Sequence, residues 1–485
     1  MNQSVHNKLV SFIWSIADDC LRDVYVRGKY RDVILPMVVL RRLDALLEPT
    51  KDAVMEELAF QRDEAGFTEW DENGLREASG YVFYNTSEWT LQRLHNTATN
   101  SQQLLQANFE DYLNGFSSNV KEIIEKFKLK SQIRHMASKD VLLDVLEKFT
   151  SPDINLTPFE KLDSNGRKLH ALSNLGMGYV FEELIRKFNE DNNEEAGEHF
   201  TPREVIDLMT HIIFDPIKNN LPPVMTIYDP ACGSGGMLTE AQNFIKDEEG
   251  EIRAINSDVY LYGKEINDET YAICKADMLI RGQNPADIQN GDTLALDMHP
   301  GKTFDYQAAN PPYGVEWKPA ETAVKKEHAK GAAGRFGPGL PAIRDGQMLF
   351  TLHLLSKMQP VVAGKGGGRI GVVHNGSPLF TGDAGGGRER NPPLDSGERL
   401  VRCHRHAARP ALLQGTSKNC RFQPVSDASC SQPADLPIFC AIPSLFRVFC
   451  APFLTHWPPA GAPRSLMACS CRTHPPRHQG TSPGA

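Results

Sequence analysis

The sequence predicts an α/β protein whose N-terminal part is helical and whose central part contains a mostly parallel sheet. Apolar residues recur at helical spacing in residues 1–165, whereas short β-rich segments alternate with helical segments in residues 166–385. Residues 386–485 show neither period. We therefore expect a helical domain, an α/β domain and a tail rich in Pro, Arg and Cys, in that order.

The helical domain is predicted by two apolar stripes, each repeating every three or four residues as one face of a helix does. The stripes consist of Leu9, Phe12, Ile13, Ile16 and Leu21, and of Val120, Ile123, Ile124 and Phe127. Pro36 precedes the apolar run "MVVL", and we place it in the first turn of a helix, where proline is tolerated. We expect this domain to be an ordinary packed helical bundle, and any function of its own to be that of a docking surface.

The α/β domain is predicted by strand-like and helix-like segments that alternate along the chain. Strands are expected at residues 225–230, 259–265, 304–310 and 368–373. Helices are expected at residues 177–188, 237–247, 267–282 and 346–358. Such alternation is typical of a parallel sheet, in which ligands bind at the carboxyl ends of the strands.

Composition and charge limit the function. The chain of 485 residues carries a net charge of −9. An acidic chain binds a phosphate backbone poorly by itself, so a nucleic-acid partner would be met through a local patch or another subunit. No apolar run reaches membrane-spanning length, and "MNQSVHNKLV" lacks the apolar core of a signal peptide. We therefore expect a cytoplasmic protein without a membrane partner.

The segment "YDPACGSGGMLTE" joins an expected strand to an expected helix. Asp229 ends the strand, and Gly233, Ser234, Gly235 and Gly236 form the turn. Glycines allow close approach of a ligand, and the N–H groups of a helix start attract an anionic group. The spacing differs from G-x-G-x-x-G, and no Lys-Ser or Lys-Thr pair follows as in a P-loop. The turn therefore indicates a nucleoside cofactor, with a purely structural turn as the alternative.

Two further acids stand at expected strand ends. Glu265 lies 36 residues after Asp229, a plausible βαβ interval, and a carboxylate there can accept hydrogen bonds from both hydroxyls of a ribose. Asp292, in "IQNGDTLALD", is placed to meet a purine edge. Each acid alone is typical of a solvated loop, but three acids beside one glycine turn favour a nucleoside site.

The segment "NPPY" predicts a rigid loop after the next strand. Proline fixes its own φ and pushes the preceding residue into an extended conformation, so Asn310, Pro311 and Pro312 are held stiffly. The Asn310 side-chain oxygen and the Pro311 carbonyl can each accept one hydrogen of an exocyclic amine, which turns the amine lone pair toward an electrophile. Tyr313 can stack on a flipped base. The alternative is a Pro-rich loop leaving an edge strand.

Together these residues resemble the modification (M) subunit of type I restriction-modification systems, an N6-adenine DNA methyltransferase family. The resemblance covers residue 1 to about residue 385. It is carried by "DPACGSGG", "NPPYGVEWK", "GEHFTPREVIDLM", "DGQMLF", "RIGVVHNGSPLFTGDAG" and, in the helical domain, "RDVILPMVVLRRLDALL".

The resemblance implies a Rossmann-like, S-adenosylmethionine-dependent methyltransferase domain at residues 166–385. It implies DNA, a specificity (S) subunit, a restriction (R) subunit and a second M copy as partners, and adenine N6 as the methyl acceptor. Asn310, Pro311, Pro312 and Tyr313 would hold the target adenine. The implied cofactor residues are Glu198, His199, Phe200, Thr201, Pro202 and Arg203 at the methionine end, Asp229, Gly233, Ser234, Gly235 and Gly236, with Glu265 at the ribose and Asp292 near the adenine.

Other readings of "NPPY" stay open. The motif also occurs in enzymes that methylate protein glutamine, RNA guanine amines or cytosine N4, and "GEHFTPREV" with the helical domain favours DNA adenine over these. Cytosine C5 methylation requires a nucleophilic Cys, and none adjoins the loop. A different class of protein is a non-catalytic assembly subunit, or a pseudogene product, that keeps cofactor binding only.

The tail departs from the family. Lys418 is its only lysine, against eleven arginines, and seven of the ten cysteines of the chain follow residue 400. A one-base shift of plausible codons for "NPPLD" reads Ile-Arg-Arg-Trp-Ile, which is similar to the sequence expected of the family at this point. We therefore interpret residues 386–485 as an accidental reading frame that replaces the last strands of the sheet, impairs activity and leaves an unpaired edge strand. Cys469, Cys471, His474 and His478 are then fortuitous, and no metal is expected.

Overall fold

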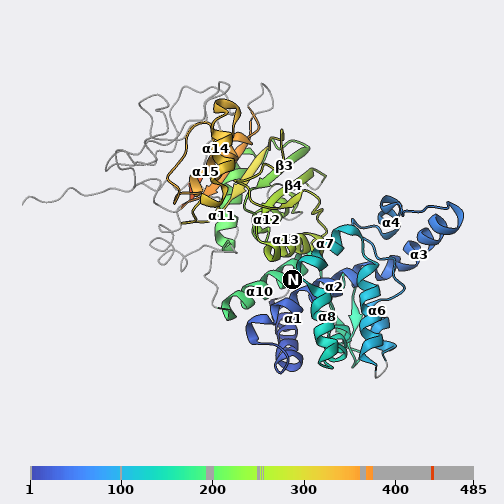
Figure 1. Cartoon of the computed structure of the whole chain (residues 1–485). Helices are drawn as coiled ribbons and strands as arrows, with labels where there is room; N and C mark the ends of the chain where they lie inside the picture. The colour runs from blue at the N-terminus through green and yellow to red at the C-terminus, as the bar shows by residue number, and fades with distance from the viewer. Residues whose placement is uncertain are drawn as a thin grey trace, which may run out of the picture.

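The computed structural model describes residues 3–98, 101–192, 201–247, 252, 254, 256–360, 367–374 and 439–441. Its helical part and its α/β part lie side by side (Figure 1). The expected Glu198, His199 and Phe200, and the tail residues Cys469, Cys471, His474 and His478, fall outside the described residues. Within the described part, no helix is long and apolar enough to cross a membrane.

The helical domain is built from helices that share one large core. Its α-helices are α1 (Gln3–Ile16), α2 (Arg31–Leu47), α3 (Lys51–Ala59), α4 (Glu72–Ser79), α5 (Leu91–Asn96), α6 (Gln102–Asn114), α7 (Ser118–Lys126), α8 (Leu129–Ser138) and α9 (Leu142–Thr150). An antiparallel hairpin of β1 (Lys161–Leu162) and β2 (Lys168–Leu169) precedes α10 (Asn174–Asp191), which packs on α1 and α2. Short 3₁₀ and π turns link several of these helices.

Helix α2 is the centre of this domain, because nearly all of its residues are buried. Pro36 is the sixth residue of α2, so our placement of Pro36 in a first helical turn is wrong. Proline lacks an N–H and normally weakens a helix interior. Here residues on every side of Pro36 are buried in the core, and that packing keeps the helix continuous.

In the residues that the structure describes, the α/β domain contains a six-stranded parallel sheet in the order β5-β4-β3-β6-β7-β8. The strands are β3 (Val224–Asp229), β4 (Asp258–Glu265), β5 (Ile288–Asn290), β6 (Tyr306–Ala309), β7 (Arg369–Val373) and β8 (Phe439–Ala441). The helices are α11 (Arg203–Phe214), α12 (Gly236–Lys246), α13 (Asp268–Ile280), α14 (Glu321–His328) and α15 (Gln347–Ser356). All four predicted strands and all four predicted helices are present, but the helix predicted at residues 177–188 is α10, which packs in the core of the helical domain.

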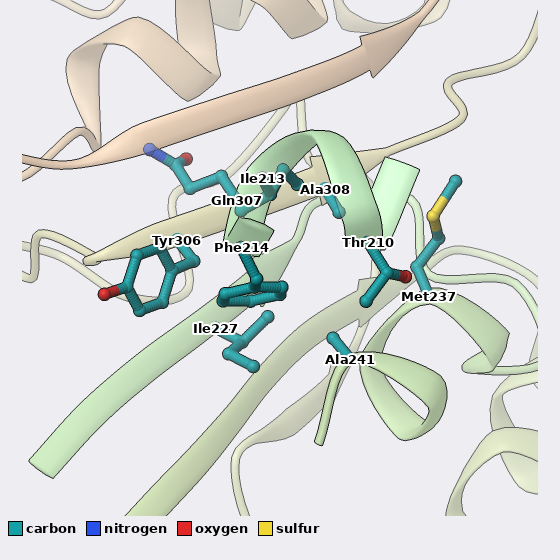
Figure 2. A pocket seen from close by; sticks show the side chains of 9 residues that line it. All are labelled: Thr210, Ile213, Phe214, Ile227, Met237, Ala241, Tyr306, Gln307 and Ala308. Atoms are coloured by element: carbon teal, nitrogen blue, oxygen red, sulfur yellow. The ribbon is translucent and has the colours of Figure 1, made fainter. Parts of the chain in front are cut away.

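The two faces of the sheet are covered by different helices, as the alternation of side chains along each strand requires. Ile227 and Leu261 point into a core with α11, α12 and α13, whereas their neighbours Tyr228 and Tyr262 point into a core with α15. Figure 2 shows part of the first core, where Phe214, Ile227, Ala241 and other side chains line a gap too small for a water molecule. This gap is a packing feature and not a binding site.

Helix α13 belongs to both parts of the protein. Ala272, Ile273, Ala276, Leu279 and Ile280 pack in the core of the helical domain. Its remaining buried apolar residues, Tyr271, Cys274 and Met278, pack against the sheet. Figure 1 places α13 between the strands and α7. Because its two sides are buried in two different cores, α13 joins the two domains.

Strand β7 is paired on both sides. We expected it to be left with an unpaired edge, but Gly371, Val372 and Val373 pair in parallel register with Phe439, Cys440 and Ala441 of β8. The short apolar run "IFCAI" at residues 438–442 has the β-branched and aromatic residues that favour a strand, and the open backbone groups of β7 supply its hydrogen-bond partners.

Candidate active site

The predicted site residues gather at the carboxyl edge of the sheet. Asp229 ends β3 and Glu265 ends β4. Asp292 follows β5 by two residues, and Asn310 comes directly after β6. Because all of these strands are parallel, their carboxyl ends lie along one edge.

The glycine turn is shaped by backbone conformations that favour glycine. Gly233 and Gly235 have φ values of +55° and +88°. A Cβ on Gly235 would lie 2.7 Å from Sγ of Cys274 on α13, so no side chain fits there. Gly235 is the N-cap of α12 and Gly236 its first residue, which leaves the N–H groups of the helix start beside the turn.

Glu265 is held against this turn by two backbone N–H groups. Its Oε2 accepts a hydrogen bond from Gly233 at 3.0 Å, and its Oε1 accepts one from Asn267 at 2.8 Å. These bonds fix the orientation of the carboxylate at the mouth of the turn. A carboxylate has about four acceptor positions, and these two backbone bonds occupy two of them.

Asp229 is buried at the base of the turn. Burial raises the pKa of its carboxyl to about 8, the Ala231 N–H lowers that pKa through a hydrogen bond of 2.9 Å, and the nearby Glu265 carboxylate raises it again. An acid in this setting is best satisfied by a proton or by a cationic group of a ligand.

Asn310 joins two motifs that are far apart in the sequence. Its Nδ2 donates to Oγ1 of Thr201 at 3.1 Å, and its Oδ1 accepts a hydrogen bond from the hydroxyl of Tyr313. Pro311 is buried and Pro312 is exposed. The loop is therefore anchored on one side, as expected of a rigid carrier for the Asn310 carboxamide.

Tyr313 packs against the protein in this structure, and its expected stacking on a base stays a prediction. Its ring packs against the core formed by α11, α12 and the sheet, and burial raises the pKa of its hydroxyl to about 12. The oxygen that was expected to meet an amine hydrogen accepts the Tyr313 hydroxyl instead. A base that used this oxygen would replace Tyr313 as its hydrogen-bond donor.

The remaining described site residues are placed as follows. Pro202 is the N-cap of α11. Arg203 turns toward α10 and α12, where its guanidinium lies 4.1 Å from the centre of the Tyr179 ring and 3.3 Å from Oε2 of Glu240. Asp292 accepts a hydrogen bond at Oδ1 from the N–H of Leu294, 2.8 Å away.

Two groups of residues near this edge were missed by sequence reasoning. Lys126 of α7 donates to Oδ1 of Asn290 at 2.9 Å, and Asn290 donates to the carbonyl of Glu265 at 3.1 Å, so the helical domain reaches the site. Lys264, Arg335 and Lys357 donate to the loop that bears Asp292. The one sequence signal was a lysine, Lys264, inside a strand that is otherwise apolar before its end.

The two domains match known families. The family model described as "N-6 DNA Methylase" matches residues 173–391, and the family model described as "HsdM N-terminal domain" matches residues 9–149. The chain belongs to the modification (methylase) subunits of type I restriction enzymes. The family match confirms the resemblance drawn from the sequence, and the two matched ranges follow the helical and α/β domains.

Individual relatives support the family and the fold. The type I restriction enzyme MjaIX methylase subunit of Methanocaldococcus jannaschii is 26% identical over 385 residues, which is 77% of this chain and 62% of the relative. The HindI methylase subunit of Haemophilus influenzae is 29% identical over 163 residues, 33% of this chain and 34% of the relative. This chain thus spans less than two thirds of either relative.

A solved structure of a type I restriction-modification system methyltransferase subunit from Streptococcus thermophilus has the same fold. It superposes with a TM-score of 0.56 at 23% identity, over 79% of this chain and 78% of the other. The predicted fold class, a helical domain followed by a methyltransferase domain with a mostly parallel sheet, is therefore confirmed.

The family and the fold imply S-adenosylmethionine as the cofactor, and the residues present fit it. Its ribose hydroxyls suit a fixed carboxylate such as Glu265, and its cationic groups suit the buried Asp229. The absence of a side chain at Gly235 lets the backbone approach a ligand closely.

Proposed function

We propose that this chain is the methyl-transferring subunit of a type I restriction-modification system and that it methylates adenine N6 in DNA. The observation that carries the proposal is the position of Asn310, which is directly beyond β6 and tied to Thr201, on the edge that holds Asp229 and Glu265. A base amine at Asn310 would thus meet the same edge of the sheet as the cofactor.

In the proposed mechanism the cofactor supplies an electrophilic methyl group, and the protein orients the amine. Oδ1 of Asn310 and the carbonyl of Pro311 each accept one hydrogen of the amine, so its lone pair points toward the methyl group. These hydrogen bonds strengthen as positive charge develops on the nitrogen. The rigid prolines keep both acceptors in place, which reduces the reorganisation needed in the transition state.

In the proposed cofactor site, Glu265 binds the ribose, Asp292 lies near the adenine of the cofactor, and the Gly233–Gly236 turn meets its methionine part together with Thr201. The local geometry supports this arrangement, because Glu265 and the turn are joined by a hydrogen bond. The proposed role of Tyr313 is to release Asn310 and to stack on the target base once the base has entered.

We further propose that the chain acts with DNA, a specificity subunit, a restriction subunit and a second M copy. The acidic net charge of −9 supports this division of labour, because sequence reading and most phosphate contacts would come from other subunits. The relatives named above are described as methylase subunits of type I restriction enzymes, and a subunit acts as part of a complex.

The test of the proposed function uses the chain with its reading frame restored beyond residue 385, and compares it with Asn310→Ala and Asn310→Asp in that same background. Isothermal titration with S-adenosylmethionine should give equal affinities for all three, because Asn310 is expected to touch only the base. Methylation of DNA in the presence of the specificity subunit should be lost in both variants. Nucleoside analysis of the product should give N6-methyladenine. N4-methylcytosine, or near-parental methylation by Asn310→Ala, would contradict the proposal.

We also keep the proposal that residues 386–485 are read in an accidental frame and that this impairs activity. The encoding DNA decides it, because the frame restored beyond codon 385 should encode residues similar to the family. The restored chain should methylate DNA faster than the present one with the same specificity subunit. Equal rates would support a tail that is compatible with activity, and cofactor binding without methylation by both chains would support a non-catalytic subunit.

A further inference from the structure

Three buried basic side chains hold the loop that follows β5. Lys264, Arg335 and Lys357 are 1%, 7% and 4% exposed. They come from β4, from the segment after α14, and from the C-cap of α15. All three donate hydrogen bonds to main-chain carbonyls between residues 292 and 299, which is the loop that bears Asp292.

Lys264 holds the first part of this loop from the strand of Glu265. Its Nζ donates to the carbonyl of Asp292 at 2.9 Å and also to the carbonyl of Leu296. The carbonyl of Lys264 accepts the N–H of Cys232 at 3.0 Å, which attaches the glycine turn to the same residue. Lys264 thus links the glycine turn, the neighbouring Glu265 and residues 292–299, which we call the purine loop.

Arg335 holds the next two residues of the loop. It donates to the carbonyl of Thr293 at 2.6 Å and to the carbonyl of Leu294 at 3.2 Å. On its other side, Arg335 makes a bidentate pair with Glu327, with distances of 2.8 and 2.6 Å. Its guanidinium also donates to Nδ1 of His353, 3.1 Å away.

The tautomer of His353 follows from this contact. A guanidinium has only donors, so Nδ1 of His353 must accept and the proton must lie on Nε2. Nε2, at 2.8 Å, then donates to the hydroxyl of Tyr228, which is the residue before Asp229. Arg335 therefore fixes both the purine loop and the polar chain under the end of β3.

A buried cation is costly unless its hydrogen bonds are satisfied, and solvent could satisfy loop carbonyls at no such cost. Three buried cations nevertheless donate hydrogen bonds to this one short loop, which indicates that the position of the loop is important for the site. Arg335 and Glu327 lie in the segment that follows the Asn310 loop in sequence. Trp317 and Phe336 of that segment share an apolar core with Leu294 of the purine loop.

We propose that Arg335 is a positioning residue for the purine end of the cofactor. It holds the Asp292 loop in the conformation that accepts the purine, and it does so from the segment that continues the target-base loop. This inference rests on the proposed function. Arg335 does not touch the cofactor in this proposal and acts only through the loop carbonyls.

The test removes both charges of the pair, so that no buried carboxylate is left alone. The double variant Arg335→Met/Glu327→Gln is compared with Arg134→Met/Glu110→Gln, a matched pair with bidentate contacts of 2.9 and 3.1 Å on the surface of the helical domain. Two probes are titrated into each protein. S-adenosylmethionine contains purine, ribose and methionine, whereas 5′-methylthioadenosine lacks the amino-acid end.

The double variant at Arg335 should bind both probes about tenfold more weakly and by the same factor, since only the purine end is affected. The surface double variant should bind both as the unaltered chain does. Unchanged affinities with a lowered melting temperature would show that the pair serves stability alone and would overturn the inference. A loss confined to S-adenosylmethionine would also overturn it, because the effect would then lie at the methionine end.

A milder variant covers the case in which the double variant does not fold. Arg335→Lys keeps the charge beside Glu327, but one ammonium cannot reproduce the fork that meets two carbonyls. Its affinity for 5′-methylthioadenosine should fall several-fold, and an unchanged affinity would overturn the inference. If the unaltered chain itself binds neither probe, the proposed function fails and this inference fails with it.

Discussion

The side-chain amide of Asn310 donates to the hydroxyl oxygen of Thr201 at 3.1 Å. In this structure the amide nitrogen therefore faces Thr201. The oxygen Oδ1 is thereby directed to the opposite side, where Tyr313 now donates to it. The threonine of one motif therefore orients the carboxamide of the other.

Replacing Thr201 should disturb that orientation. Thr201→Val removes the acceptor but keeps the shape, so about 1 kcal/mol of hydrogen-bond energy is lost and the amide can rotate. The methylation rate of the frame-restored chain at saturating cofactor should fall by at least about fivefold. Thr201→Ser keeps the hydroxyl and should retain most of the rate. Equal rates for the Val and Ser variants would show that the contact has no such role.

Glu265 should be required for cofactor binding. Glu265→Ala removes the carboxylate that lies against Gly233 and should weaken S-adenosylmethionine binding by at least about tenfold, or about 1.4 kcal/mol. Glu269→Ala is the control, because Glu269 lies in the first turn of α13 and pairs with Arg31 of the helical domain. Calorimetry that finds the two variants equal would remove Glu265 from the site.

Gly235 should not tolerate a side chain. Gly235→Ala combines about 1–2 kcal/mol of left-handed strain with a 2.7 Å approach of Cβ to Sγ of Cys274. Gly80→Ala isolates the strain, since Gly80 has φ +72° and nothing within 4 Å of an added Cβ. Urea unfolding should therefore show a larger loss of stability at Gly235 than at Gly80.

The contact part of that loss can be measured separately. A double-mutant cycle with Cys274→Ala removes the sulfur. Gly235→Ala should cost less stability in the Cys274→Ala background than it does in the unaltered chain. Strictly additive effects of the two changes would show that the sulfur contact contributes nothing.

Asp229 should make stability depend on pH. Its folded pKa, about 8, lies above the ordinary value of 3.8 because burial favours the neutral carboxyl. The contribution of the protonated Asp229 to the free energy of unfolding is therefore fully present below about pH 4 and is lost as the pH rises through about 8. Asp229→Asn should lack this component. Unfolding free energies measured from about pH 5 to about pH 8 should fall more steeply for the unaltered chain, and parallel curves would contradict the assignment.

The strands and the acids at their ends could be predicted because their signals are local. An apolar run, an acid and a glycine turn stand together around Asp229, and parallel topology then brings Glu265 and Asp292 to the same edge. The Arg335 contacts could not be predicted, because they join Arg335 to main-chain carbonyls 42 and 41 residues away. Every residue has such a carbonyl, so the residue types give no signal for these bonds.

Two further differences have the same kind of cause. Pro36 was misplaced because the local rule for proline was overridden by burial on all sides of α2. The pairing of β8 with β7 was missed because the strand contains only three residues and is separated from β7 by a long stretch of chain. In both cases tertiary contacts outweigh the local pattern.

Helix α13 couples the cofactor site to the rigidity of the helical domain. It begins at Asp268, three residues after Glu265, and its buried side chains complete the cores on both sides. A ligand that binds at Glu265 therefore raises the free energy needed to expose α2 and α7 as well as the sheet. We expect amide hydrogens of α2 and α7, far from the ligand, to exchange with solvent more slowly when S-adenosylmethionine is present.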